Sequence, residues 1–173
     1  MFERKSRGAM MDDLTMLFKP SPANLAIRMA DQADAAAISA MVVTTLRQNH
    51  AAECRPAVIE ALAADFSWEK TSAAMARRKT LVAVMHGAII GTAGLEVAKV
   101  QAVFVAPAWQ RQGVGSALMD EIEHLASCSQ CSRVALWSSL TARDFYAKRG
   151  YATLASQIHR DIATLLMRKS LVR

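Results

Sequence analysis

The residues with the clearest chemical potential lie between Val103 and Ser116, in the sequence VFVAPAWQRQGVGS. A run of β-branched and aromatic residues ends at Pro107, and a turn containing glycine then leads into an amphipathic segment, which predicts a buried strand, a turn and a helix. The first N–H groups of a helix have no partner within it, and the helix dipole adds partial positive charge there. Because Gly113 and Gly115 carry no side chain, an anion can approach these amides closely. The segment therefore predicts a phosphate-binding site.

The elements that must position this segment are predicted from hydrophobic periodicity and turn residues. Asp31 is a plausible N-cap for the first helix, and Pro56 suits the first turn of the second. The predicted helices cover residues 31–48, 57–66, 69–78, the segment after Gly113 and 139–149. The predicted strands cover residues 25–29, 80–85, 88–96, 100–106, 133–137, a segment from 151 onward and 164–168, with a hairpin turn at His86-Gly87. Antiparallel strands followed by alternating strands and helices predict a mixed α/β (α+β) fold.

Length and composition predict a single globular domain. The chain has 173 residues, 53% of them apolar, and no apolar run approaches the roughly 20 residues of a membrane-spanning helix. We expect residues 1–24 to form an N-terminal tail or arm and residues 25–173 to form the domain. The net charge of +6 favours anionic ligands, but the basic residues form no stripe with interleaved aromatic residues, which disfavours a nucleic-acid-binding module.

Three cysteines argue against a disulfide framework and favour the reducing cytoplasm. Cys128 and Cys131 form a CxxC pair where a helix should end, whereas a thioredoxin-like pair opens a helix and a zinc site needs two more ligands. We therefore expect no metal site. The three tryptophans, Trp68, Trp109 and Trp137, are interpreted as packing residues, with shielding of a cofactor as an alternative for Trp109.

Two motifs together resemble the GNAT superfamily of CoA-dependent N-acyltransferases. The Q/R-x-x-G-x-G/A signature is matched by residues 110–115, after an apolar strand that ends in Val105-Ala106-Pro107. The later N-x-x-A-x-x-F-Y-x-x-x-G-F segment is matched at the same spacing by Ser139, Ala142, Phe145, Tyr146, Gly150 and Tyr151. The resemblance covers about residues 80–169. It implies a GNAT-like, mostly antiparallel sheet of six to seven strands with helices on both faces.

The resemblance also implies a set of residues that bind acetyl-CoA as co-substrate. The backbone of one strand would face the pantetheine arm, as in the addition of a strand to a sheet. The strand residues are Val103, Phe104 and Val105. The residues implied around the pyrophosphate are Arg111, Gln112, Gly113, Val114, Gly115 and Ser116. The second motif adds Ser139, Ala142, Phe145 and Tyr146. A plain helix-capping role for Ser139 is equally compatible with the sequence.

Tyr146 is our candidate for the general acid, because a phenol with a pKa near 10 can protonate a departing thiolate. The alternative is a packed aromatic side chain. Some relatives place a glutamate at the start of the cofactor strand, where this chain has Lys99 and Gln101. Glu96, just before the turn that leads into this strand, is the candidate base, and a solvated side chain is the alternative. The remoter candidates are His159, Glu53 and His50.

The implied activity is transfer of an acetyl group to a primary amine of a small molecule or peptide. We expect the acceptor to enter around residues 47–56 and to meet the loop near residues 157–159. Arg47, His50 and Arg55 hint at an acceptor that carries a carboxylate. We expect no nucleic-acid or membrane partner, and the resemblance allows a homodimer. A non-catalytic acyl-CoA sensor remains the alternative, because the usual carboxylate is missing from the cofactor strand.

Overall fold

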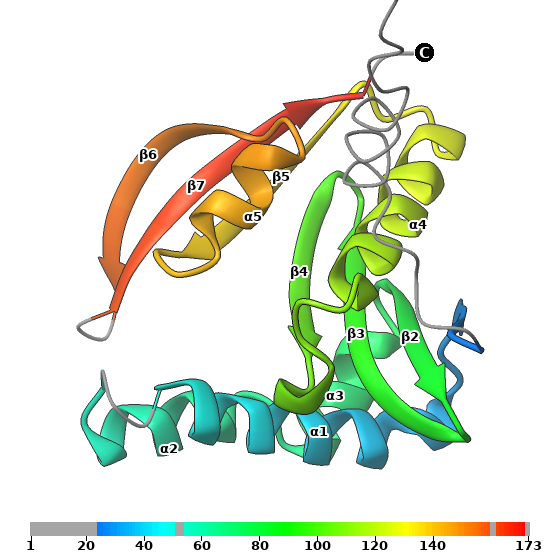
Figure 1. Ribbon diagram of the computed structural model, residues 1–173, viewed down its shortest axis with the longest axis vertical. Helices are drawn as coiled ribbons and strands as arrows, with labels where there is room; N and C mark the ends of the chain where they lie inside the picture. The colour runs from blue at the N-terminus through cyan, green and yellow to red at the C-terminus, as the bar shows by residue number, and fades with distance from the viewer. Residues whose placement is uncertain (1–23, 51–53, 160–161, 172–173) are drawn as a thin grey trace, which may run out of the picture.

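The computed structural model describes residues 24–50, 54–159 and 162–171, without the side chains of His50 and His159. A seven-stranded sheet runs through this part of the chain (Figure 1). In spatial order the strands are β1 (Ala26–Met29), β2 (Lys79–Met85), β3 (Ala88–Glu96), β4 (Lys99–Val105), β5 (Arg133–Ser139), β7 (Ile162–Ser170) and β6 (Ala152–His159). All neighbouring pairs are antiparallel except β4 and β5. The predicted mixed, mostly antiparallel sheet is confirmed.

Five α-helices accompany the sheet in the described residues: α1 (Ala35–His50), α2 (Pro56–Ala64), α3 (Trp68–Met75), α4 (Val114–Cys128) and α5 (Arg143–Lys148). Two short 3₁₀ turns, η1 (Gln32–Asp34) and η2 (Pro107–Trp109), precede α1 and α4. None of the helices in these residues is long and apolar enough to cross a membrane.

Local sequence signals explain several boundaries. Asp31 begins η1 through a capping box, in which its carboxylate accepts from the Ala33 amide at 2.8 Å and Asp34 accepts from the Asp31 amide at 2.9 Å. His86 and Gly87 both have positive φ, as a tight hairpin turn requires. The helix predicted from Ser139 is wrong in its start: Ser139 is the last residue of β5, and α5 begins only at Arg143.

The two faces of the sheet carry separate apolar clusters. On one face α4 buries Leu118, Met119 and Ile122 against the central strands. Gly91 allows this close packing, because a Cβ there would lie 3.0 Å from Cδ1 of Leu118. On the other face Val82 packs with apolar residues of α1, supported by α2 and α3. These helices fix the orientation of β3 and β4.

The sheet splits between β4 and β5. These strands share one register pair, Lys99 with Ala135, whereas β5 and β7 pair along seven positions from Arg133 to Ser139. Figure 1 shows β4 and β5 separating beyond their common start. A β-bulge lies at the same place, where Ala102 has φ of 52° and two β4 residues face one β3 residue. The bulge turns β4 away from β5 and leaves the β5-facing edge of β4 without a ladder.

The packing interpretation of the tryptophans holds for only one of them. Trp109 packs against the main core. Trp68 is 58% exposed and Trp137 is 40% exposed, so the expectation was wrong for both. Successive side chains of a strand point to opposite faces of the sheet. On β5 the indole of Trp137 points to the face that carries the cavity at the split.

Candidate active site

The start of α4 presents free backbone donors, as the sequence predicted. Gly113 is the N-cap, with φ of 87°, and no side chain caps the helix. The amides that follow it, beginning with Val114, therefore have no acceptor within the helix. The turn before them is held by Gln112, whose Nε2 donates to the Ala108 carbonyl at 2.7 Å. Arg111 also has positive φ, 58°, and its side chain is exposed.

The two sequence motifs meet at Gly115. A Cβ built on Gly115 would lie 3.5 Å from Cζ of Phe145 and 3.7 Å from Cγ2 of Val105. The start of α4, the end of β4 and α5 therefore converge on one point. Because these distances are ordinary contacts, the protein itself does not require glycine here. A small side chain would therefore pack between Phe145 and Val105 beside the free amides.

Tyr146 lies inside this convergence rather than at the surface. Its side chain is 6% exposed and makes edge-to-face contacts with Phe145 and Tyr151, with ring centroids 5.0 and 5.6 Å apart. Burial raises the pKa of Tyr146 to about 12, and the nearby Arg149 charge opposes this rise. The phenol is therefore protonated at any physiological pH and acts as a hydrogen-bond donor.

A charged network joins α4 to the chain around α5. Glu123 accepts from Lys169 at 2.6 Å, from Tyr151 at 3.2 Å and from Arg149 at 3.3 Å. Arg149 also donates to Asp120 at 2.6 Å. The sequence gives no sign of this network, because its members are scattered over fifty residues and match no motif. It holds the second motif, and with it Tyr146, at a fixed position against α4.

The predicted strand residues divide between the two sides of β4. Val103 and Val105 face the α4 core, whereas Phe104 turns to the other side and meets Phe66 edge-on with centroids 5.1 Å apart. The Val105 carbonyl accepts from Nε2 of Gln110 at 2.9 Å. Gln110 thereby ties the motif to the strand end, a contact that the sequence did not reveal.

Ser139 and Ala142 lie in the connection from β5 to α5. The Ser139 hydroxyl accepts from the Ala142 amide at 3.3 Å and lies 3.0 Å from the Thr141 hydroxyl. The N-cap of α5 is Ala142, so Ser139 stabilises the turn before the helix rather than the helix itself. The capping role considered for Ser139 is therefore corrected to a role in this turn.

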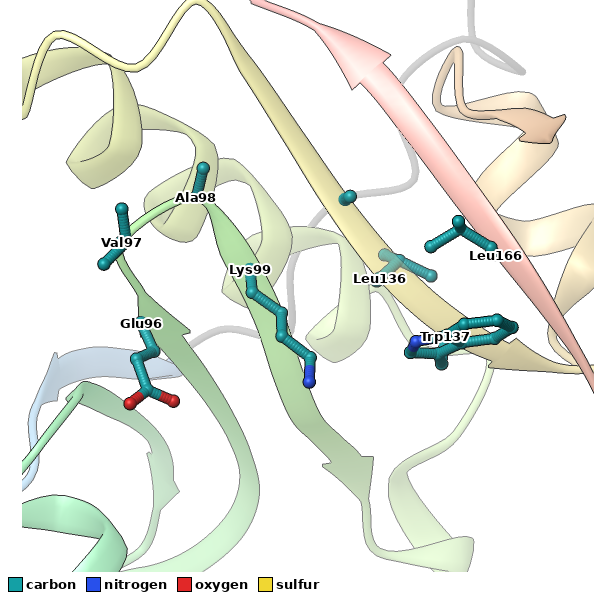
Figure 2. A pocket seen from close by; sticks show the side chains of 8 residues that line it. Glu96, Val97, Ala98, Lys99, Leu136, Trp137 and Leu166 are labelled. Carbon is teal, nitrogen blue, oxygen red and sulfur yellow. The ribbon is translucent and has the colours of Figure 1, made fainter. Parts of the chain in front are cut away.

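A cavity of about 360 Å³ lies at the split, on the sheet face away from α4 (Figure 2). Its lining residues come from the β3–β4 turn, β5 and β7: Glu96, Val97, Ala98, Lys99, Ala135, Leu136, Trp137 and Leu166. The Glu96 carboxylate accepts from Nε2 of Gln101 at 2.7 Å. Gln101 directly precedes the bulge at Ala102, so the hydrogen bond holds the carboxylate near the point where β4 turns away.

The residues predicted near the acceptor are only partly described. Arg47 forms an exposed ion pair with Glu60 at 2.8 Å, which occupies the charge that we had considered for an acceptor carboxylate. Glu53 and the side chains of His50 and His159 lie outside the described residues.

The acetyltransferase (GNAT) domain family matches residues 42–171, three quarters of the chain. The chain belongs to the GNAT acetyltransferase family. Its match extends from within α1 to the end of β7, so both sides of the split belong to the family domain.

Solved structures resemble this GNAT protein over most of its length. A GCN5-related N-acetyltransferase from Rhodopseudomonas palustris is 28% identical, with a TM-score of 0.80 over 86% of this chain and 97% of that chain. The PaiA N-acetyltransferase from Thermoplasma acidophilum, solved with coenzyme A, is 18% identical, with a TM-score of 0.76 over 84% and 98%. The yncA protein from Salmonella typhimurium, solved with its cofactor acetyl-CoA, is 20% identical, with a TM-score of 0.61 over 87% and 95%. No curated protein matches this sequence.

Proposed function

We propose that this GNAT protein transfers an acetyl group from acetyl-CoA to a primary amine of a small molecule or peptide, and that residues 25–173 form the domain that does so. The observation that carries the proposal is the open edge of β4 beside the uncapped start of α4. The edge of β4 offers unpaired backbone groups to the amides of the pantetheine arm. The start of α4 offers unpaired N–H donors to the diphosphate.

The proposed acetyl-CoA contacts rest on backbone rather than on special side chains. Residues 103–105 would pair with the pantetheine arm, and residues 111–116 would hold the diphosphate. Ser139, Ala142, Phe145 and Tyr146 would lie along the other wall of the split. Two fold relatives solved with coenzyme A and acetyl-CoA support this choice of ligand.

The proposed reaction is direct attack. The amine nitrogen forms a bond to the thioester carbonyl carbon, the C–S bond breaks, the ammonium proton leaves through Glu96 or water, and the thiolate takes up a proton. A lysine-like amine is neutral about once in 2,500 molecules at pH 7, which costs about 4.6 kcal/mol. Orientation of two bound reactants supplies about 7–11 kcal/mol, so positioning outweighs deprotonation.

The raised pKa of Tyr146 shapes its proposed part in this reaction. Full transfer of a proton from a phenol with a pKa of about 12 to a thiolate whose acid has a pKa near 8.5 costs about 5 kcal/mol. A hydrogen bond from the phenol to the developing thiolate has no such cost. We therefore assign Tyr146 as a donor that stabilises the leaving sulfur, with solvent supplying the proton.

Glu96 is the proposed acceptor of the ammonium proton. Its carboxylate lies at the cavity on the opposite face from α4, and Gln101 holds it by a hydrogen bond of 2.7 Å. No other acidic residue lines that cavity in the described chain. This lining position supports the choice of Glu96 as the proposed base.

The sensor remains a second candidate, because Lys99 and Gln101 occupy the strand positions where some relatives have a glutamate. Calorimetry with acetyl-CoA, followed by thiol release with amino acids, polyamines, aminoglycosides and peptides, separates the two functions. We expect tight binding and thioester cleavage that depends on the amine. Binding of acetyl-CoA without thioester cleavage for any amine would support the sensor. Absence of acetyl-CoA binding would exclude both the transferase and the sensor.

A further inference from the structure

The cavity at the split has an unpaired positive charge. Lys99 lines the cavity, and its side chain runs along the face of β4 (Figure 2). Within the described residues its ammonium forms no hydrogen bond or ion pair. The neighbouring β5 residues on the lining are apolar, so nothing on that wall compensates the charge. An occupant with an anionic group would complete this side of the cavity.

Arg78 adds a second positive charge to the sheet face that carries Lys99. The Arg78 side chain lies across β3 over Gly94, where a Cβ would come within 2.8 Å of its Nε. A side chain at position 94 would force the guanidinium group of Arg78 to shift. The Nε atom is buried and has no hydrogen-bond partner among the described residues. Arg78 and Lys99 therefore flank one carboxylate, that of Glu96.

The remaining wall is apolar. Trp137 on β5 is 40% exposed, and Figure 2 shows its indole beside Leu166 with its nitrogen toward the Lys99 side of the cavity. An exposed indole next to an aliphatic side chain suits an apolar ligand group, and its N–H can donate to a carboxylate.

We propose that the acceptor is a free amino acid with an apolar side chain. Its carboxylate would pair with Lys99, its amine would face Glu96, and its side chain would cover Trp137 and Leu166. This inference rests on the proposed function, because it names the acceptor of that same site.

The charge balance argues against polycationic acceptors. Polyamines and aminoglycosides carry several ammonium groups, and each needs a carboxylate or open solvent. The cavity has one carboxylate and one ammonium on its lining. A ligand with one group of each sign matches this pair.

The test compares each amino acid with the amine that lacks only its carboxylate: leucine with 3-methylbutylamine, and phenylalanine with phenethylamine. We expect wild-type kcat/KM to favour the amino acid about 10- to 100-fold, the range for one hydrogen-bonded charge. Lys99→Met should remove this preference by lowering kcat/KM for the amino acids alone. Lys99→Arg should keep it, and Lys99→Glu should reverse it.

Lys70→Met is the matched control, because Lys70 is exposed on α3 and pairs with Asp65 at 3.0 Å, away from the cavity lining. It should leave both rates unchanged. Equal rates for the paired substrates, an unchanged preference in Lys99→Met, or acetylation confined to polyamines or aminoglycosides would overturn the inference while acetyl transfer stands. Acetyl-CoA binding without acetylation of any amine would overturn the proposed function and the inference together.

Discussion

The two sides of the split in the sheet offer different chemical groups: backbone groups on the α4 side and side chains on the opposite side. On the α4 side the notable features are backbone groups and missing side chains: the positive φ of Gly113, the close approach of Phe145 to Gly115 and the free edge of β4. On the opposite side the features are side chains, those of Glu96, Lys99 and Trp137.

This difference separates what is general from what is particular in the proposed reaction. Backbone donors recognise phosphate and amide groups whatever the surrounding side chains, as long as glycine keeps the approach open. Recognition by side chains changes with a single substitution. We therefore expect changes on the α4 side to remove acetyl-CoA binding, and changes on the other side to alter which amine reacts.

The largest effect is expected for Gly113→Val. Valine is strained at φ of 87° and crowds the amides that follow, so the Kd for acetyl-CoA should rise at least about 100-fold by calorimetry. Gly87→Val is the matched control, since Gly87 has φ of 78° in an exposed turn with no atom within 4 Å of a Cβ. It should share the strain but keep the affinity. An equal loss of acetyl-CoA affinity in both variants would show that backbone strain, and not crowding of the amides, causes the effect.

A smaller effect, about 100-fold on kcat, is expected for Tyr146→Phe, because the thiolate loses a hydrogen-bond donor. Acetyl-CoA affinity should change little, since the ring remains. Tyr151→Phe removes the neighbouring hydroxyl, which bonds Glu123 at 3.2 Å, and should keep most of the turnover. Unchanged kcat in Tyr146→Phe would exclude the phenol from the reaction.

Glu96→Gln should lower kcat/KM about 10-fold near pH 7, because the amide cannot accept the ammonium proton. The loss should shrink as the pH approaches the pKa of the acceptor amine, where the amine is already neutral. Glu69→Gln on exposed α3 provides the control. A loss that is equal at every pH would indicate that Glu96 positions the acceptor without taking its proton.

The smallest effect is expected from pH itself. Burial raises the pKa of Tyr146 to about 12, so the phenol keeps its proton throughout the usual assay range. The kcat at saturating acceptor should therefore not fall between about pH 9 and 10.5. A fall near pH 10, absent in Tyr146→Phe, would show that the phenol ionises like an exposed tyrosine.

Several features could be predicted because they depend on local chemistry. The His86-Gly87 hairpin, the Asp31 cap and the uncapped helix after Gly113 each follow from the conformational preferences of a few neighbouring residues. The start of α5 could not be predicted in this way. Ser139 suits a helix cap, but pairing of β5 with β7 continues to Ser139 and delays the helix to Arg143.

By itself the sequence determined the alternation of strands and helices, the glycine turn before α4 and the two motifs, since periodicity and glycine act over short stretches. Only the tertiary structure decided the placement of β7 between β5 and β6, the Glu123 network, the burial of Tyr146 and the cavity between Lys99 and Trp137. These depend on which distant strands pair and where a bulge separates them, and such contacts leave no periodic signal in the chain.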